Sequence, residues 1–179
     1  MMLHSALLEI VGPEASASML SQFSVRNSWP LAELRTQIME RFGARSGVGL
    51  LWRIGRSYFR DYLTNLEETS ELLQPEQRFL PFKRKASEGL VILAKMFSEI
   101  DSQRVTTSTK DGIYYWRIES CLECMGNDFD PSMCSFYLGF AQEFLAWIGS
   151  GKAFLVDEVE CISRGAGACL IQIDPTPVE

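Results

Sequence analysis

The hydrophobic pattern of this chain changes its period near residue 100, and no other feature restricts the fold as much. Before that point the apolar residues recur at helical spacing, and the clearest stripe consists of Leu90, Leu93, Ala94 and Phe97. Beyond it, β-branched and aromatic residues dominate, and Lys110-Asp111-Gly112 is a typical hairpin turn. The sequence therefore predicts a helical half over residues 1–100 and a half built on a sheet over residues 101–179.

The helical half is expected to contain helices over residues 13–23, 30–42, 47–63 and 85–100. Pro13 and Pro30 favour helix starts, and Gly43 favours a helix end, because these residue types are common at those boundaries. Gly55 lies inside the third helix, where glycine lowers helix stability relative to alanine. We expect this glycine to be tolerated because it allows close packing against a partner helix or a ligand.

The second half is expected to form an antiparallel sheet that is interrupted by one helix. A hairpin over residues 104–119 comes first, and an aromatic-rich helix over residues 133–149 follows it. Two more strands are predicted at 153–161 and 168–174, joined by a short connection that contains two glycines. Together the halves predict one α+β domain over residues 1–179, in which N-terminal helices pack on a C-terminal sheet.

Composition and missing motifs argue against several classes of function. The net charge of −6 argues against a nucleic-acid partner, which needs a basic surface. No stretch approaches the roughly 18–20 apolar residues that span a bilayer, so a cytoplasmic protein is expected. The single histidine, His4, lies far from the cysteines, and no glycine-rich phosphate loop is evident. No catalytic residue is predicted, and the sequence favours a protein that is not an enzyme.

All five cysteines lie beyond residue 120, so any cysteine chemistry belongs to one region. In a cytoplasmic chain such cysteines are better interpreted as thiols or metal ligands than as disulfides. If the last two strands pair symmetrically about Gly165, Cys161 faces Cys169 with Cβ atoms about 4.5–5.5 Å apart. Two thiolates at that spacing can share a zinc ion, since each Zn–S bond is about 2.3 Å. The alternative is that both are small buried core residues.

Other ligands are available for such a site. Cys134 stands at the predicted start of the aromatic-rich helix, where a helix N-terminus favours the thiolate. Glu158 would complete four ligands. Residues three apart on a regular strand point to opposite faces, so Glu158 and Cys161 converge only across a bulge or a strand end. Cys121 and Cys124 form a CxxC pair that supplies competing ligands or a second, weaker metal site.

The aromatic residues of the second half are more often core than a binding pocket, and both interpretations stay open. The chain has 11 Phe and 4 Trp, which is enough to line a pocket as well as to fill a core. Buried indole and phenol groups need hydrogen-bond partners in either case. The residues concerned are Tyr114, Tyr115, Trp116, Phe136, Tyr137 and Phe140.

The sequence resembles the 4-vinyl reductase domain family, also described as hydrocarbon-binding proteins. The resemblance covers most of the chain, and its C-terminal part is the more specific. There a carboxylate, two cysteines and a glycine recur at fixed spacing. The residues that carry it are Arg53-Ile54-Gly55-Arg56, Phe59, Trp116-Arg117-Ile118-Glu119-Ser120, Cys134, Gly139-Phe140, Glu158-Val159-Glu160-Cys161, Gly165 and Cys169.

This resemblance implies a fold similar to the transport-particle (TRAPP) subunits and a homodimer formed through the helices. Related sensory domains of phenol-responsive transcription activators bind zinc through three cysteines and one glutamate. The resemblance therefore implies a zinc site of Cys134, Glu158, Cys161 and Cys169. In those sensors a histidine and a tryptophan hold an aromatic ligand, and Trp116 is the counterpart of the tryptophan. The expected ligand pocket is lined by Trp116, Tyr114, Phe136, Tyr137, Phe140 and Phe59.

Three functions are compatible with this sequence. The favoured one is binding of a small hydrophobic or aromatic molecule, such as a tetrapyrrole or a hydrocarbon, by a zinc-stabilised sensor-like domain. The family name implies a second, an enzyme or accessory protein for 4-vinyl reduction in bacteriochlorophyll biosynthesis. The sequence offers no hydride-cofactor site and no clear proton donor for that reaction. The third is a dimeric scaffold or tether.

Overall fold

The computed structural model describes residues 2–22, 31–66, 72, 74, 79–100, 103–124 and 134–178. Most of the polar segment at 67–81 and of the loop that follows Cys124 lies outside these residues. The helices are α1 (Met2–Val11), α2 (Pro13–Leu20), α3 (Leu31–Phe42), α4 (Ala44–Thr64), α6 (Phe82–Ile100) and α7 (Ser135–Ile148). The strands are β1 (Arg104–Lys110), β2 (Ile113–Glu119), β3 (Phe154–Glu160) and β4 (Cys169–Pro177), with a 3-10 turn at Ile162–Arg164.

The predicted α+β fold is confirmed, and most of its boundaries follow local sequence signals. Pro13 begins α2, and Gly43, with φ of 78°, separates α3 from α4. A positive φ favours glycine, which has no Cβ to clash with the backbone. The sequence did not predict α1 because no proline or capping residue marks its start. It also placed the starts of α4 and α6 three residues too late.

The four strands form one antiparallel sheet in the order β1-β2-β4-β3. The β1–β2 hairpin turns at Asp111 and Gly112, both with positive φ, as the turn signal in the sequence predicts. The last strand, β4, lies between β2 and β3, so the chain leaves the sheet after β2 and returns through α7 to the edge strand. This crossing brings the end of β2, the start of α7 and the β3–β4 connection together.

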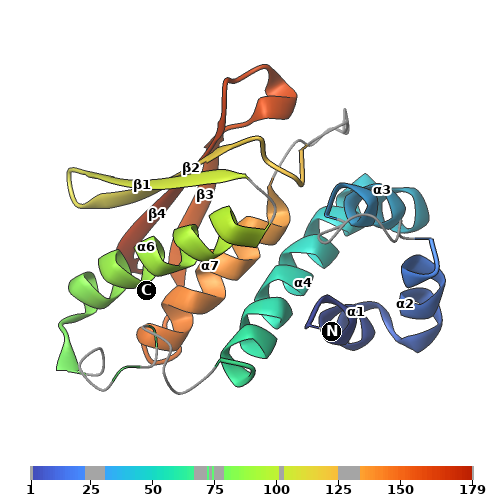
Figure 1. Ribbon diagram of the computed structural model, residues 1–179, viewed down its shortest axis with the longest axis horizontal. Helices are drawn as coiled ribbons and strands as arrows, with labels where there is room; N and C mark the ends of the chain where they lie inside the picture. Colours follow the sequence, from blue (N-terminus) through green and yellow to red (C-terminus); the bar gives the residue numbers. More distant parts are fainter. Residues whose placement is uncertain are drawn as a thin grey trace.

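Helices cover one face of the sheet (Figure 1). In this view α6 and α7 lie against the strands, α4 lies beside α7, and α1–α3 lie on the side of α4 away from the sheet. The apolar stripe predicted on α6 is buried, as are most of the aromatic residues of α7. The core therefore extends from the sheet through α6 and α7 to α4.

Two glycines bring α4 and α7 into backbone contact. A Cβ on Gly55 would overlap the carbonyl oxygen of Phe136 and lie 2.9 Å from its carbonyl carbon. A Cβ on Gly139 would overlap the carbonyl oxygen of Trp52 in the same way, 2.8 Å from its carbonyl carbon. The close packing expected at Gly55 is therefore with a helix of the same chain.

The membrane question can be addressed for the described helices. None of them is both long enough and apolar enough to cross a bilayer.

Candidate metal centre and aromatic core

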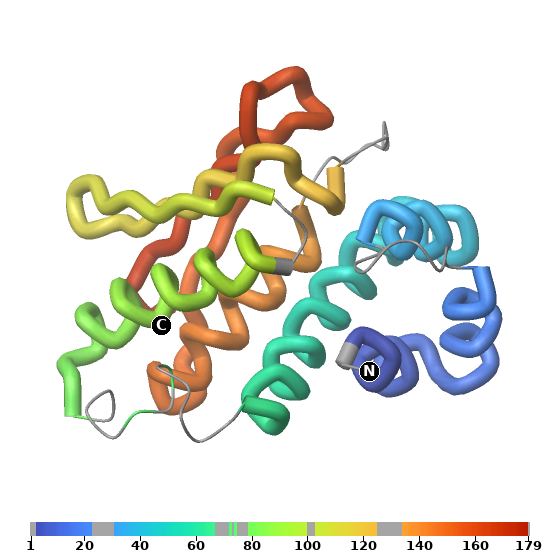
Figure 2. Tube along the Cα trace, in the orientation of Figure 1, coloured from blue at the N-terminus to red at the C-terminus, as the bar shows by residue number. Residues whose placement is uncertain are grey.

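The five cysteines come from three separate segments that converge near one end of the sheet (Figure 2). Cys121 and Cys124 follow β2, Cys134 directly precedes α7, and Cys161 and Cys169 stand on either side of the 3-10 turn between β3 and β4. All five are free thiols, and none of them is more than 5% exposed. The crossover through α7 thus assembles one buried cysteine cluster.

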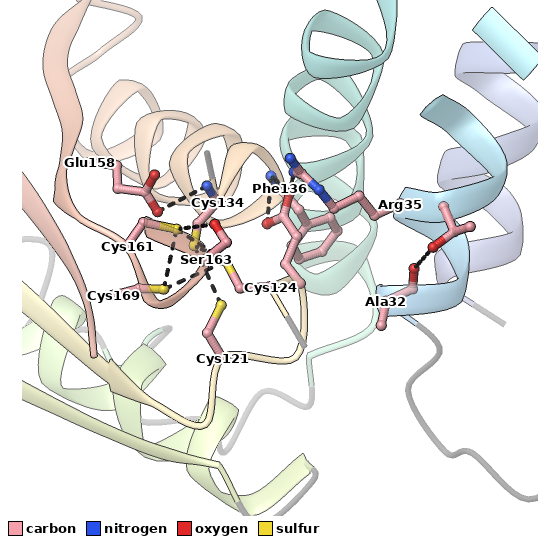
Figure 3. Close-up of polar contacts among 12 residues, drawn as sticks. Ala32, Arg35, Cys121, Cys124, Cys134, Phe136, Glu158, Cys161, Ser163 and Cys169 are labelled. Carbon is pink, nitrogen blue, oxygen red and sulfur yellow. Dashed lines mark hydrogen bonds and ion pairs between the residues drawn. The ribbon is translucent and has the colours of Figure 1, made fainter. Parts of the chain in front are cut away.

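The sulfur atoms of this cluster lie against one another (Figure 3). The Sγ of Cys124 is 3.3 Å from that of Cys134, 3.4 Å from that of Cys161 and 3.6 Å from that of Cys169. Cys161 and Cys169 are 3.8 Å apart. A disulfide bond is about 2.0 Å long, so these are not disulfides. Thiolates that surround one tetrahedral zinc at about 2.3 Å are about 3.8 Å apart, close to these distances.

Glu158 reaches the cluster because β3 is bulged. Glu158 pairs with Ile171, whereas Glu160 pairs with Leu170, so Val159 is an extra residue on the β3 side. Such a bulge is the irregularity that lets Glu158 and Cys161 point to the same side of the sheet. The pairing of Glu160 with Leu170 also keeps the symmetry about Gly165 that the sequence suggested.

The structure brings all four predicted ligands together and adds one. The donor atoms of Cys134, Glu158, Cys161 and Cys169 lie within 4.8 Å of one another, and the Sγ of Cys124 belongs to the same group. Cys121 lies outside this group of five, although its Sγ is 3.4 Å from that of Cys134. Both members of the CxxC pair therefore adjoin the predicted ligands.

Two buried carboxylates hold the N-terminal end of α7. The backbone N–H of Cys134 donates to Oε1 of Glu158 at 3.1 Å, and that of Phe136 donates to both oxygens of Glu123 at 3.1 Å. The first N–H groups of a helix have no partner within the helix, and negative charge is favourable beside them. The other oxygen of Glu158 is buried, makes no hydrogen bond within the described residues and lies 3.5 Å from Nη2 of Arg164.

Mutual hydrogen bonds and burial separate the pKa values in the cluster. The pKa of Cys161 is lowered to about 5, chiefly because the Cys134 thiol donates a hydrogen bond to its thiolate. The pKa of Cys134 is raised because it is the donor in such contacts, first of all with Cys121. Burial raises the pKa of Glu158 to about 8. Thiolates are the form that binds metal, and the cluster already favours one at Cys161.

Arg35 and Glu123 form a buried ion pair between α3 and the segment that carries the CxxC pair. Nη1 of Arg35 lies 3.3 Å from Oε1 of Glu123, and the two side chains are 2% and 0% exposed. Burial raises the pKa of Glu123 to about 8, and the Arg35 charge opposes this shift. The sequence analysis missed this pair. A signal existed, because Arg35 shares the buried face of α3 with the apolar residues Leu31 and Ile38.

Arg35→Met is expected to lower the free energy of unfolding by about 3 kcal/mol, because it leaves a buried carboxyl without its cationic partner. Urea denaturation measures this change. Arg41→Met, at an exposed arginine of the same helix, is the control and should change stability by about 0.5 kcal/mol or less. Adding Glu123→Gln to Arg35→Met should recover part of the loss. A double variant as unstable as the sum of the two single variants would contradict the pairing.

The six predicted pocket residues belong to one buried core, and none is more than 8% exposed. The ring of Phe140 lies 5.1 Å from that of Phe59 and 4.8 Å from that of Phe97, and the ring of Phe97 lies 5.9 Å from that of Trp116. Phe136 and Tyr137 continue the same cluster, whereas Tyr114 donates its hydroxyl to the carbonyl of Lys83 in α6. These rings fill the space between the sheet, α6, α7 and α4.

The buried polar groups of this core have partners, with one exception. Nε1 of Trp116 donates to the carbonyl of Leu90 at 3.1 Å, and the hydroxyl of Tyr137 donates to Oε1 of Gln103 at 3.0 Å. Gln103 directly precedes β1 and is 2% exposed. Its Nε2 has no hydrogen-bond partner within the described residues. The sequence analysis did not single out Gln103, because nothing local marks a polar residue that long-range packing buries.

The fold and the cysteine cluster define a class of small α+β domains with a cysteine-rich sheet half. Residues 115–175 match the family model of the V-4-R (vinyl-4-reductase) domain. The resemblance to the 4-vinyl reductase family is thus confirmed over this segment, and the chain contains a vinyl-4-reductase domain that includes all five cysteines. No curated protein matches the chain.

Solved structures share this fold. The phenol-responsive sensory domain of the transcription activator PoxR, determined with phenol, superposes with a TM-score of 0.58 at 19% identity. The match covers 90% of this chain and 89% of that one. An H-NOX protein from S. oneidensis in the Fe(II)NO ligation state gives a TM-score of 0.64 at 11% identity, covering 99% of this chain and 98% of that one. At these identities the likeness is one of fold.

Proposed function

We propose that this protein is a sensory domain that binds a small aromatic molecule in its aromatic core and is held together by zinc at its cysteine cluster. The PoxR sensory domain, whose structure was determined with phenol, has the same fold. The single observation that carries the proposal is the unpaired Nε2 of the buried Gln103 beside the aromatic rings.

The donor set of the cluster supports zinc. Thiolates bind zinc, copper(I) or iron–sulfur clusters, whereas calcium and magnesium prefer oxygen ligands. Sulfur atoms 3.3–3.8 Å apart suit a bare ion between them, not a cluster that contains its own sulfide. Cys134, Cys161 and Cys169 would hold the ion with Glu158 or Cys124, and burial on all sides is typical of a structural site. Zinc would supply cohesion between three chain segments and no reaction chemistry.

Elemental analysis tests the zinc directly. Protein purified under reducing conditions without added metal should contain at least one zinc ion per chain. Folded, reduced protein without zinc would contradict this part of the proposal.

The aromatic core supports a ligand that combines a flat ring with an oxygen atom. An unpaired buried N–H costs about 1–3 kcal/mol, and a hydroxyl or carbonyl oxygen of a ligand would remove that cost at Nε2 of Gln103. The neighbouring Tyr137 ring lies 5.2 Å from that of Phe97, so a ligand at Gln103 would contact aromatic faces. Because these rings touch one another, ligand entry requires some of them to move. A single ring requires less movement than a tetrapyrrole.

Gln103→Leu is expected to weaken phenol binding about fivefold and to leave toluene binding unchanged. The loss of one hydrogen bond of about 1 kcal/mol accounts for this ratio. Isothermal titration calorimetry with the two ligands measures it. Gln172→Leu, at a half-buried glutamine of β4, is the matched control and should bind both ligands like the wild type. An unchanged phenol-to-toluene ratio would remove Gln103 from the site, and a wild type that binds neither ligand would contradict the proposed ligand class.

A further inference from the structure

The cysteine cluster contains more donors than one zinc ion can use. A structural zinc takes four ligands, but five thiols and the Glu158 carboxylate meet here, all of them buried. The carboxylate has an oxygen that makes no hydrogen bond within the described residues. Two of the six donors would therefore remain unused around a single ion.

These six donors divide into two overlapping sets of four. Cys134, Glu158, Cys161 and Cys169 lie within 4.8 Å of one another and form the first set. Cys121 lies outside that set but contacts the thiols of Cys124, Cys134 and Cys169.

The second set is therefore the CxxC pair together with Cys134 and Cys169. Its Cys124 lies 3.3 Å from Cys134 and 3.6 Å from Cys169, measured between sulfur atoms. Cys134 and Cys169 belong to both sets, with Cys161 and Glu158 on one side and Cys121 and Cys124 on the other.

The number of donors matches two metal ions. Two four-coordinate ions form eight metal–ligand bonds, and six donors provide eight bonds when two thiolates bridge both ions. The charges agree as well. Five thiolates and one carboxylate carry six negative charges, and two divalent ions leave a net charge of −2, which is that of a single zinc held by four thiolates. With one ion, Cys121 and Glu158 would have to remain protonated in the buried cluster to reach the same charge.

We propose that the cluster binds two divalent thiophilic ions bridged by the thiolates of Cys134 and Cys169. Cys161 and Glu158 complete the first ion, and Cys121 and Cys124 complete the second. This second site rests on the zinc proposed above and gives the CxxC pair a role that the four predicted ligands leave open. The bridged pair joins the end of β2 to the β3–β4 connection through the start of α7.

Titration of the reduced, metal-free full-length chain with cadmium-113 tests this proposal. Native mass spectrometry should show saturation at two ions per chain, and cadmium NMR should show two resonances that are coupled through the shared sulfur atoms. Cys121→Ser removes a ligand of the second ion only, so this variant should saturate at one ion and show one resonance.

The other outcomes are informative in different ways. A wild type that saturates at one ion overturns the second site and leaves the zinc proposal intact, whereas a folded wild type that binds none removes both. Two ions that persist in Cys121→Ser place the second ion elsewhere, and two uncoupled resonances contradict the bridge. If Cys121→Ser does not fold, the wild-type count and the coupling still decide the question.

Discussion

Gly139→Ala is expected to lower the free energy of unfolding by more than about 4 kcal/mol. The new Cβ would overlap the backbone carbonyl of Trp52, and a backbone carbonyl cannot rotate away as a flexible side chain can. Helices α4 and α7 would have to separate over their whole contact, which joins the helical half to the sheet half. Cores rarely lose this much from one added methyl, so the value is diagnostic of backbone contact.

Equilibrium denaturation in urea, monitored by circular dichroism, measures the loss. The matched control is Gly49→Ala, in an exposed turn of α4, where a Cβ meets no atom within 4 Å. That control should raise stability by up to about 1 kcal/mol, because alanine favours helix over glycine. Gly55→Ala, on the other side of the contact, should resemble Gly139→Ala. A loss below about 1 kcal/mol in Gly139→Ala would show that the helices separate easily.

The features that the sequence predicted well are those that depend on neighbouring residues. Pro13 and Gly43 mark helix boundaries through their own backbone preferences, and Asp111-Gly112 marks the hairpin turn. The facing of Cys161 and Cys169 follows from symmetric pairing about a short connection, which needs only the order of residues along the chain. Local chemistry was sufficient in each of these cases.

The features that the sequence did not reveal depend on packing between distant segments. The bulge at Val159, which turns Glu158 toward the cysteines, follows from how β3 fits against β4, and no glycine marks it. The ion pair of Arg35 with Glu123 joins residues 88 positions apart. The unpaired amide of Gln103 exists only because α6, α7 and the sheet close over it. The metal donors could therefore be named from the sequence, whereas their supporting residues required the structure.

Removing the metal from the folded protein is expected to lower the melting temperature by roughly 10–20 °C. The metal joins three segments that are otherwise connected at this point through thiol contacts and two carboxylates, and we expect its loss to cost about 5 kcal/mol. For a chain of this length each kcal/mol corresponds to about 2–4 °C. Differential scanning calorimetry before and after chelation, with the metal content determined each time, measures the shift.

The position of the effect distinguishes a metal clamp from a general loss of stability. Hydrogen exchange after metal removal should accelerate first at the N–H groups of Phe136 and Ile162, which donate to Glu123 and to Sγ of Cys169 beside the cluster. The N–H groups in the middle of α4 should keep their protection until global unfolding. Cys161→Ser, which loses a proposed ligand, is the matched variant, and chelation should shift its melting temperature much less. If the wild type releases its metal with no change in melting temperature, the five cysteines are core residues that bind metal without stabilising the fold.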